Sequence, residues 1–430
     1  MAAETLRQPL ALPAETLPNR IAKAAMTEGL ADARGLPTPG LERLYDAWAR
    51  GGAGLLITGN VIVDRDHLER PGNVIADRPA DAETVARWTA WAKAARGRGA
   101  GAWVQINHAG RQTQAMVNPA PKAPSAVPLG LPGKNFAPPV ALTEDEILDL
   151  IARFANAAWL AREAGFSGAQ IHAAHGYLIS QFLSPRSNRR TDSWGGSLQN
   201  RARFLIETVR AARAKVGRDF TLSVKLNSAD FQKGGFAAQD SLAVAARLAE
   251  EGVDVLEISG GTYEQPRMAG MEGIEKLNTE GMPASTAARE AYFLDFATEM
   301  RKRAALPLMV TGGFRTADAM ARAITEDGVA IIGIARPMCV DPLAPAKILS
   351  GAAALDKWEE KLRLGPGWLG PRSPIRMIKA INGFGALYWY YQQLRRLAVG
   401  AAPDEALSLM RALKLEQEAQ AAMLKAMRAA

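Results

Sequence analysis

The segment GAQIHAAHGY, residues 168–177, joins a short apolar run of β type to a cluster of polar side chains. The run has the length and composition of a buried strand, and His172, His175 and Tyr177 lie at its end. Two of the four histidines of the chain are therefore three positions apart. This spacing fits a metal site, a pair of hydrogen-bonded core histidines, or two neutral donors directed at a substrate oxygen.

Seven further apolar runs of this kind occur between residues 20 and 345, with longer amphipathic stretches between them. The alternation is typical of repeated βα units around a parallel sheet. Eight such units predict either a closed (β/α)8 TIM barrel or a doubly wound open sheet. The seven runs are IAKAAM (21–26), AGLLITGNV (53–61), GAWVQI (101–106), TLSVKL (221–226), VDVLEIS (253–259), LPLMVT (306–311) and VAIIGI (329–334).

The stretches between the runs carry the signals of helix ends. TEDEILDLIARFANAAWLAREAG, residues 143–165, opens with Thr143, has Glu146 three residues later and ends in glycine. Thr and Glu at this spacing can cap the first turn reciprocally, and glycine commonly ends a helix. Residues 197–217 and 240–252 have the same polar start and glycine stop, so we expect helices there as well.

Two regions depart from this rhythm. Residues 111–142 contain seven prolines and little periodicity, which predicts a long excursion over the mouth of a barrel, between the third strand and its helix. After about residue 350 the pattern is helical only, with helices expected over 387–397 and 403–427. We therefore assign residues 1–350 to a barrel and residues 351–430 to a helical C-terminal extension that packs on the barrel or forms a subunit contact.

Composition narrows the classes of function. The 430-residue chain has a formal net charge of +8, but its basic and acidic residues are interleaved, so we expect no nucleic-acid partner. We expect no membrane span, because no run of about 18 apolar residues occurs, and no signal peptide. Cys339 is the single cysteine, which excludes a disulfide framework, a cysteine-based zinc site and an iron–sulfur cluster within this chain. It also favours a cytoplasmic location.

The ends of the last two runs predict a phosphate site. Gly312 and Gly313 follow the seventh run along the chain, and Ala335 and Arg336 follow the eighth. Closely approaching backbone N–H groups and a guanidinium bind a phosphate monoester, and barrels commonly place such a site here. A lone Gly-Gly pair more often marks a turn, so it is the two strand ends together that favour phosphate. The glycine fingerprint of a dinucleotide site does not follow the first run, so a mononucleotide cofactor fits better.

Along residues 5–345 the chain carries, in order, NRIAKAAMTEG, QINHAGRQ, IHAAHGYLISQFLSPRSNRRTDSWGGSLQNRARF, TGGFRT and Gly-x-Ala-Arg-Pro at 333–337. Together these motifs resemble the old yellow enzyme family of FMN-dependent ene-reductases, and the long central segment is the most specific of them. The resemblance implies a TIM barrel that binds FMN, takes electrons from NADH or NADPH and acts on a small-molecule substrate.

The resemblance implies a role for each strand end. Lys225 would lie near flavin N1 and O2, where many members of the family have arginine, and Thr27 would tune the flavin potential. The phosphate would be bound by Gly312, Gly313, Ala335 and Arg336. The isoalloxazine ring would be lined by Ala24, Ala25, Met26, Thr27, Gly59 and Gln105.

The same resemblance gives the opening segment a catalytic role. His172 and His175 would donate hydrogen bonds to the carbonyl oxygen of the substrate, and Tyr177 would deliver a proton. Reduction of an activated C=C bond needs hydride at the β carbon, a pull on the carbonyl oxygen and a proton at the α carbon. Two imidazole N–H groups and a phenol suit the last two tasks. We expect no metal here, because no third histidine, cysteine or carboxylate completes a ligand set at a convincing spacing.

Three functions stay open at this level. The first is an FMN enzyme that uses NAD(P)H to reduce the C=C bond of α,β-unsaturated carbonyl compounds by a ping-pong cycle. The second keeps the flavin but makes the enzyme a demethylase, an amine dehydrogenase or a quinone reductase, and the third is a non-catalytic binding barrel. We expect residues 111–142 and the loop at 260–285 to set the selectivity of the pocket. The sequence is also compatible with a homo-oligomer.

Overall fold

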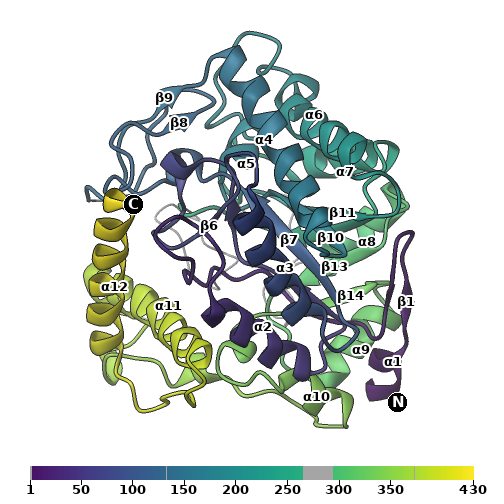
Figure 1. The fold of residues 1–430 in the computed structure, drawn as a ribbon, viewed down its shortest axis with the longest axis vertical. Coiled ribbons are helices and arrows are strands. Elements are labelled where there is room, and N and C mark those ends of the chain that lie inside the picture. The colour runs from purple at the N-terminus through teal and green to yellow at the C-terminus, as the bar shows by residue number, and fades with distance from the viewer. Residues whose placement is uncertain (1, 132, 265–293, 372) are drawn as a thin grey trace.

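Eight parallel strands close into a barrel at the centre of the protein (Figure 1). The computed structural model describes residues 2–131, 133–264, 294–371 and 373–430. The predicted TIM barrel is confirmed, and each of the eight predicted runs overlaps one of its strands. The strands, in their order around the barrel, are β3 (Ile21–Lys23), β4 (Leu55–Ile57), β7 (Gly101–Asn107), β10 (Gly168–Ala173), β11 (Thr221–Asn227), β12 (Val255–Ser259), β13 (Leu308–Thr311) and β14 (Ile331–Ile334).

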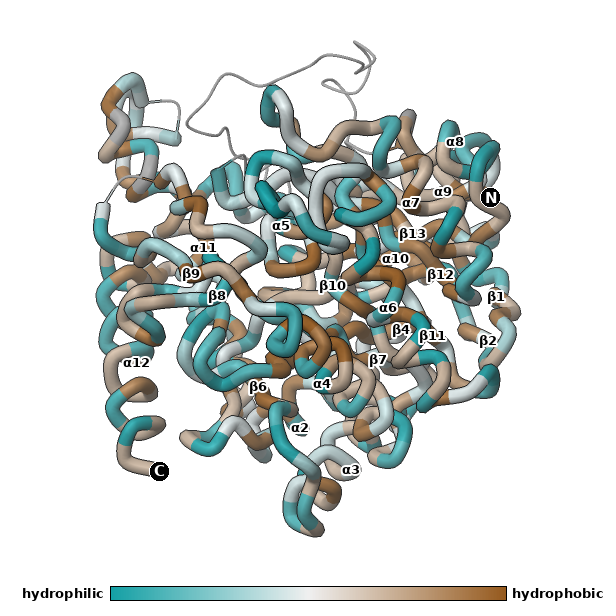
Figure 2. Tube along the Cα trace, turned by 90° about the horizontal axis from the view of Figure 1, so that it is seen from above, coloured by the Kyte–Doolittle hydropathy of each residue, from teal (hydrophilic) through white to brown (hydrophobic). Residues whose placement is uncertain are grey.

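The barrel strands are buried on both faces. Every residue of β7, β10 and β11 is buried, because side chains fill the lumen and helices cover the outside. Figure 2 shows the hydrophobic residues concentrated along the strands in the interior, with hydrophilic residues frequent on the outer helices and loops. This double burial explains why the strands read in the sequence as nearly continuous apolar runs.

Helices pack around the outside of the barrel. The hydroxyl of Thr143 accepts a hydrogen bond from the backbone of Glu146 at the start of α4 (Glu144–Glu163), and the Glu146 carboxylate accepts one from the backbone of Thr143, so the predicted capping box is confirmed. The helices expected over 197–217 and 240–252 are also present, as α6 (Leu198–Val216) and α7 (Ala238–Glu250). The others are α1 (Ala2–Arg7), α2 (Pro39–Arg50), α3 (Ala82–Arg96), α5 (Leu178–Leu183), α8 (Leu294–Arg303), α9 (Ala317–Thr325) and α10 (Ala344–Leu349).

A short hairpin closes the amino-terminal end of the barrel. Its strands, β1 (Leu10–Ala11) and β2 (Thr16–Leu17), pair antiparallel. Between them, Glu15 accepts hydrogen bonds from the Trp103 indole at 2.6 Å and from the Thr221 hydroxyl at 3.0 Å, near the starts of β7 and β11. The carboxyl ends of the strands are the ends that remain for a ligand.

Residues 111–142 form the predicted excursion between β7 and α4. Within it β8 (Lys122–Ala123) and β9 (Val140–Ala141) pair in parallel. The ring centroid of Phe136 lies 6.2 Å from that of Tyr263, on the loop that follows β12. The excursion therefore reaches the carboxyl-terminal rim of the barrel. Residues 265–285 of the second loop expected to shape the pocket lie outside the described residues.

Two long helices form the C-terminal extension, α11 (Arg376–Ala398) and α12 (Leu409–Ala429). They pack against each other, and α11 packs against α2 on one flank of the barrel (Figure 1). The helices expected over 387–397 and 403–427 are thus present with different bounds. The first extends further toward the N-terminus, and its Gly385 allows close contact with Leu409, since an added Cβ would lie 3.2 Å from Leu409 Cβ. The second begins only after Ser408, whose side chain caps it.

An ion pair of Glu416, in α12, holds the C-terminal extension against the barrel. Its fully buried carboxylate pairs with the guanidinium of Arg70, which is also buried and lies shortly before β6 (Val74–Ile75). The side-chain amides of Gln392 and Gln420 donate to the same carboxylate at 2.9 and 3.1 Å. Breaking a buried pair of this kind leaves a charge without compensation in a region of low polarity.

Replacing Glu416 with alanine should lower the free energy of unfolding by about 3–5 kcal/mol, because the Arg70 charge would stay buried without its partner. Urea unfolding measures the change. Glu418→Ala is the matched control on the same helix: that carboxylate is exposed and lies 3.9 Å from Lys414, so its loss should cost less than about 1 kcal/mol. Equal losses in the two variants would contradict this role of Glu416.

Candidate active site

His172 lies near the carboxyl end of β10, beside Lys225 of β11. The backbone N–H of Ala174 donates to its Nδ1 at 3.2 Å, so the proton of the neutral ring lies on Nε2. Burial lowers the pKa of His172 well below its usual value, and the charges of His175 and Lys225 lower it further. The residue is therefore a neutral imidazole whose Nε2–H makes no hydrogen bond to the described part of the chain.

His175 is held in an uncommon backbone conformation, with φ of 62°. Its N–H donates to Oδ1 of Asn227 at 3.1 Å, and its ring Nε2 lies 2.6 Å from the hydroxyl of Ser259. Its ring centroid is 4.9 Å from that of His172. Burial, and then the charge of Lys225, lower the pKa of His175 well below its usual value. One nitrogen of this neutral ring is thus engaged by the protein, and Nδ1 is the one left for a substrate.

Tyr177 starts helix α5, and its ring centroid lies 4.8 Å from that of His172. Its hydroxyl is 2.9 Å from the hydroxyl of Tyr263 and 3.5 Å from Nδ2 of Asn60. Burial raises the pKa of the phenol well above its usual value, and the nearby Glu69 carboxylate raises it further. Tyr177 therefore stays protonated at neutral pH. Sequence reasoning did not identify Asn60, Glu69 or Tyr263, although the loop at 260–285 contains the last of these.

A chain of polar side chains crosses the lumen and orients two of the predicted cofactor residues. Glu257 pairs with Lys225 at 2.8 Å and accepts from Nε2 of Gln170 at 2.8 Å. Since a carboxylate only accepts, Gln170 presents its amide nitrogen to Glu257 and its oxygen to Nε2 of Gln105, at 2.7 Å. The side-chain oxygen of Gln105 is left as an acceptor for a bound group. Gln170 and Glu257 were not identified from the sequence. The signal that could have found them is the presence of polar residues within buried strands.

The residues expected beside the isoalloxazine follow β3: Ala24 is buried, and Ala25, Met26 and Thr27 are half-buried. The hydroxyl of Thr27 accepts from Nδ2 of Asn60 at 3.3 Å, which ties this segment to Tyr177. Gly59 is confined by the protein itself, because an added Cβ would lie 2.2 Å from Oε2 of Glu28 and 2.3 Å from the carbonyl oxygen of Met26. Close packing of two loops is thus sufficient reason for glycine at this position.

The residues expected at the phosphate lie at the carboxyl ends of β13 and β14: Gly312, Gly313, Ala335 and Arg336. Gly312 and Gly313 have φ of 127° and 85°, values that favour glycine. The hydroxyl of Thr311 is buried and makes no hydrogen bond to the described residues. The guanidinium of Arg336 is one-third exposed and lies 3.7 Å from a carboxylate oxygen of Glu359 in the extension.

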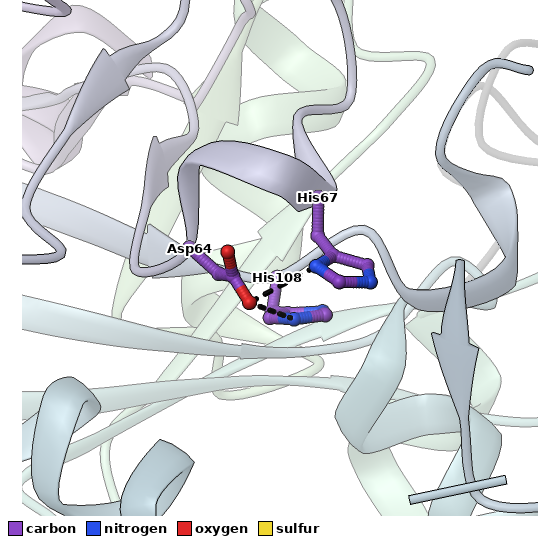
Figure 3. A group of neighbouring side chains, drawn as sticks. All are labelled: Asp64, His67 and His108. Atoms are coloured by element: carbon purple, nitrogen blue, oxygen red, sulfur yellow. Dashed lines mark hydrogen bonds and ion pairs between the residues drawn. The ribbon is translucent and has the colours of Figure 1, made fainter. Parts of the chain in front are cut away.

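Asp64, His67 and His108 form a group with metal-like spacing in the described part of the chain (Figure 3). His67 Nδ1 and His108 Nε2 lie 3.0 and 3.6 Å from the same Asp64 oxygen. The other nitrogen of each ring accepts a backbone N–H, from Lys122 at 2.8 Å and from Gly110 at 3.0 Å respectively. The nitrogens that face Asp64 therefore carry the protons and offer no lone pair to a metal. We interpret the group as a structural contact beneath the excursion.

Residues 5–354 match the NADH:flavin oxidoreductase / NADH oxidase family. The NADH-dependent flavin oxidoreductase iliE of Hypocrea jecorina (strain QM6a) is 39% identical over 350 residues, which cover 78% of this chain and 86% of that protein. The chain belongs to this family.

Solved structures agree with this membership in the NADH:flavin oxidoreductase family. An old yellow enzyme homologue from Zymomonas mobilis superimposes with a TM-score of 0.67 at 27% identity, covering 82% of this chain and 94% of the other. Morphinone reductase gives a TM-score of 0.65 at 26% identity, covering 82% and 91%. Helices long and apolar enough to cross a membrane do not occur among the described residues.

As a member of the NADH:flavin oxidoreductase family, the protein is an FMN-dependent NAD(P)H oxidoreductase. The donors present fit the cofactor. The unpartnered Thr311 hydroxyl and two glycines with positive φ suit a phosphate, and the free oxygen of Gln105 suits a ring N–H. The structure thus brings the predicted cofactor residues and the opening segment to one rim of the barrel.

The stability of the protein should fall as the pH drops below about 6.5, because the unfolded chain takes up protons on histidines that are buried and neutral in the folded state. Burial lowers the pKa of His108 to about 4. His108→Gln removes one such group and should reduce the loss of unfolding free energy between pH 6.5 and 5 by about 1.5 kcal/mol. Urea unfolding at fixed FMN concentration measures both slopes, and identical slopes would refute the expectation.

Proposed function

We propose that this enzyme reduces the C=C bond of α,β-unsaturated carbonyl compounds with electrons from NAD(P)H. The observation that carries the proposal is the pairing of two groups at one strand end. The Nε2–H of His172 makes no hydrogen bond to the described residues and is available to a substrate oxygen, and the protonated Tyr177 phenol lies beside it, with 4.8 Å between ring centroids. A substrate that accepts only electrons needs neither a hydrogen-bond donor at this position nor a proton donor beside it.

The cofactor residues are proposed in the same way. When bound, FMN would supply the hydride for the β carbon with electrons taken from NAD(P)H, as a ping-pong cycle requires. We propose that residues 1–350 hold it and that residues 351–430 pack on them. The residues assigned to the ring are Ala24, Ala25, Met26, Thr27, Gly59, Gln105 and Lys225, and those assigned to the phosphate are Gly312, Gly313, Ala335 and Arg336.

The protein residues then polarise and protonate the substrate. His172 Nε2–H donates to the carbonyl oxygen, and the ring remains a donor because its lowered pKa keeps it neutral. His175 offers a second contact through Nδ1, since Ser259 occupies its other nitrogen. Negative charge that develops on the substrate oxygen is stabilised by these bonds, and the Tyr177 O–H gives its proton to the α carbon.

An anaerobic titration of the isolated FMN enzyme tests the reaction class. NADH or NADPH should bleach the flavin absorbance, and 2-cyclohexen-1-one should restore it with formation of the saturated ketone. Flavin that an amine reduces in place of NAD(P)H, or that quinones but no enone reoxidise, would replace this proposal with a dehydrogenase or a quinone reductase that uses the same barrel.

Tyr177→Phe removes the acid while keeping the ring. Turnover of 2-cyclohexen-1-one should fall about 100-fold, because the α carbon loses its proton donor. Reduction of p-benzoquinone should keep its rate, since the proton there goes to an oxygen that water can reach. Stopped-flow absorbance of the flavin measures both rates. An unchanged enone rate would remove Tyr177 from the acid role.

Arg336→Ala should weaken FMN binding at least about tenfold, because a charged hydrogen-bond donor to the phosphate is lost. Fluorescence titration of the apoenzyme with FMN measures the affinity. Arg322→Ala on the outside of α9 removes an exposed guanidinium and serves as the control, with unchanged affinity expected. Equal affinities in the two variants would place the phosphate elsewhere.

A further inference from the structure

A chain of three polar groups leads away from the acid Tyr177. Its hydroxyl lies 2.9 Å from that of Tyr263, which in turn lies 3.3 Å from Oε1 of Glu69. The three residues come from different segments, since Tyr177 follows β10, Tyr263 follows β12 and Glu69 precedes β6. Tyr177 is 5% exposed, whereas Glu69 and Tyr263 are half-buried. Oε2 of Glu69 is buried and makes no hydrogen bond to the described residues, so Glu69 is the end of the chain at which a proton from outside must enter.

Each turnover leaves Tyr177 without its proton. A phenolate at this position is costly, because the site is buried and the charge of Glu69 opposes a second negative charge. The nitrogen of Asn60, 3.5 Å from the phenol oxygen, is a neutral donor and does not supply a proton. The acid therefore needs a route by which it is reprotonated before the next substrate.

We propose that Tyr263 and Glu69 form a proton relay that recharges Tyr177 from solvent, a role that rests on the proposed ene-reduction. The Tyr177 O–H bond breaks as its proton goes to the α carbon. The Tyr263 O–H proton passes to the Tyr177 oxygen, and the carboxylic acid of Glu69 passes its proton to the Tyr263 oxygen. Water then returns one proton to the Glu69 carboxylate, so the cycle consumes one proton from solvent.

The protonation state of Glu69 also sets the direction of the chain. With Glu69 ionised, the Tyr263 O–H points to the carboxylate and the Tyr177 O–H points to Tyr263. With Glu69 protonated, both bonds reverse, and the Tyr177 proton is free to point to the substrate. Tyr263 and Glu69 are positioning residues in this scheme, because they act on the substrate through Tyr177.

The surroundings of Glu69 favour the protonated form of its carboxyl group. Burial raises the pKa of its carboxyl group, and the charge of Arg70 opposes this effect. The Arg70 charge is itself balanced by Glu416. The phenols of Tyr388 and Tyr391, from α11, are the other titratable groups that interact with Glu69 from the extension. A carboxyl group of this kind takes up a proton more readily than an ordinary surface glutamate.

Tyr263→Phe and Glu69→Gln test the relay in the FMN-loaded full chain. Each should slow NADH-driven turnover of 2-cyclohexen-1-one about tenfold and leave p-benzoquinone reduction unchanged. Tyr391→Phe removes a neighbouring phenol oxygen and is the matched control, with both rates expected at the wild-type level. Wild-type enone rates in Tyr263→Phe and Glu69→Gln, with Tyr177→Phe slow, would overturn the relay.

The pH profile separates a relay from a merely structural role. In the wild type the enone rate should fall as the pH rises through the pKa of Glu69, because the proton source is lost. In Glu69→Gln this limb should disappear, and Glu69→Asp should restore part of it. A slow variant that keeps the wild-type pH profile would overturn the relay.

Infrared difference spectroscopy of the resting enzyme gives a readout that needs no turnover. The carboxylic acid band of Glu69, assigned by its loss in Glu69→Gln, should titrate above the range of an ordinary glutamate and should shift in Tyr263→Phe. Titration at the ordinary value would overturn the relay. If the wild type reduces no enone, the proposed function fails, and the infrared titration still shows whether Glu69 is a proton-exchanging group.

Discussion

The site depends on the backbone hydrogen bonds that pair β7 with β10 in the closed barrel. They place Gly168–Ile171 beside Trp103–Ile106, so the third and fourth barrel strands along the chain meet at a fixed register. A shift of one residue would turn Gln170 out of the lumen and break its bond to Gln105. The orientation of the cofactor residues is therefore a consequence of sheet register.

Burial keeps the two imidazoles neutral, and the charge of Lys225 adds to its effect. Lys225 lies beside His172 in the sheet and disfavours a proton on either ring, while Glu257 compensates Lys225 without contacting the histidines in the described structure. A charge-paired lysine thus lies beside two neutral imidazoles, an arrangement that suits the proposed polarisation of a substrate carbonyl.

Local patterns in the sequence predicted most of the fold and the strand ends at which the candidate site lies. The eight strands and the capping box of Thr143 depend on residues close together in the sequence, and the segment around His172 carried a recognisable motif. Tyr263 and Glu69 contact Tyr177 or each other across 86 and 194 positions, which no local pattern encodes. The bounds of α12 likewise depended on Ser408 and on its packing against α11.

The buried pair of Arg70 and Glu416 joins the extension to the residue next to Glu69 in the chain. The barrel and the extension are consequently not interchangeable modules. A chimera that takes its last 80 residues from a relative would need an acid at the position of Glu416 as well as matching surfaces. Sequence changes in α12 are therefore limited by the residues at the rim of the barrel. Changes at the rim are in turn limited by α12.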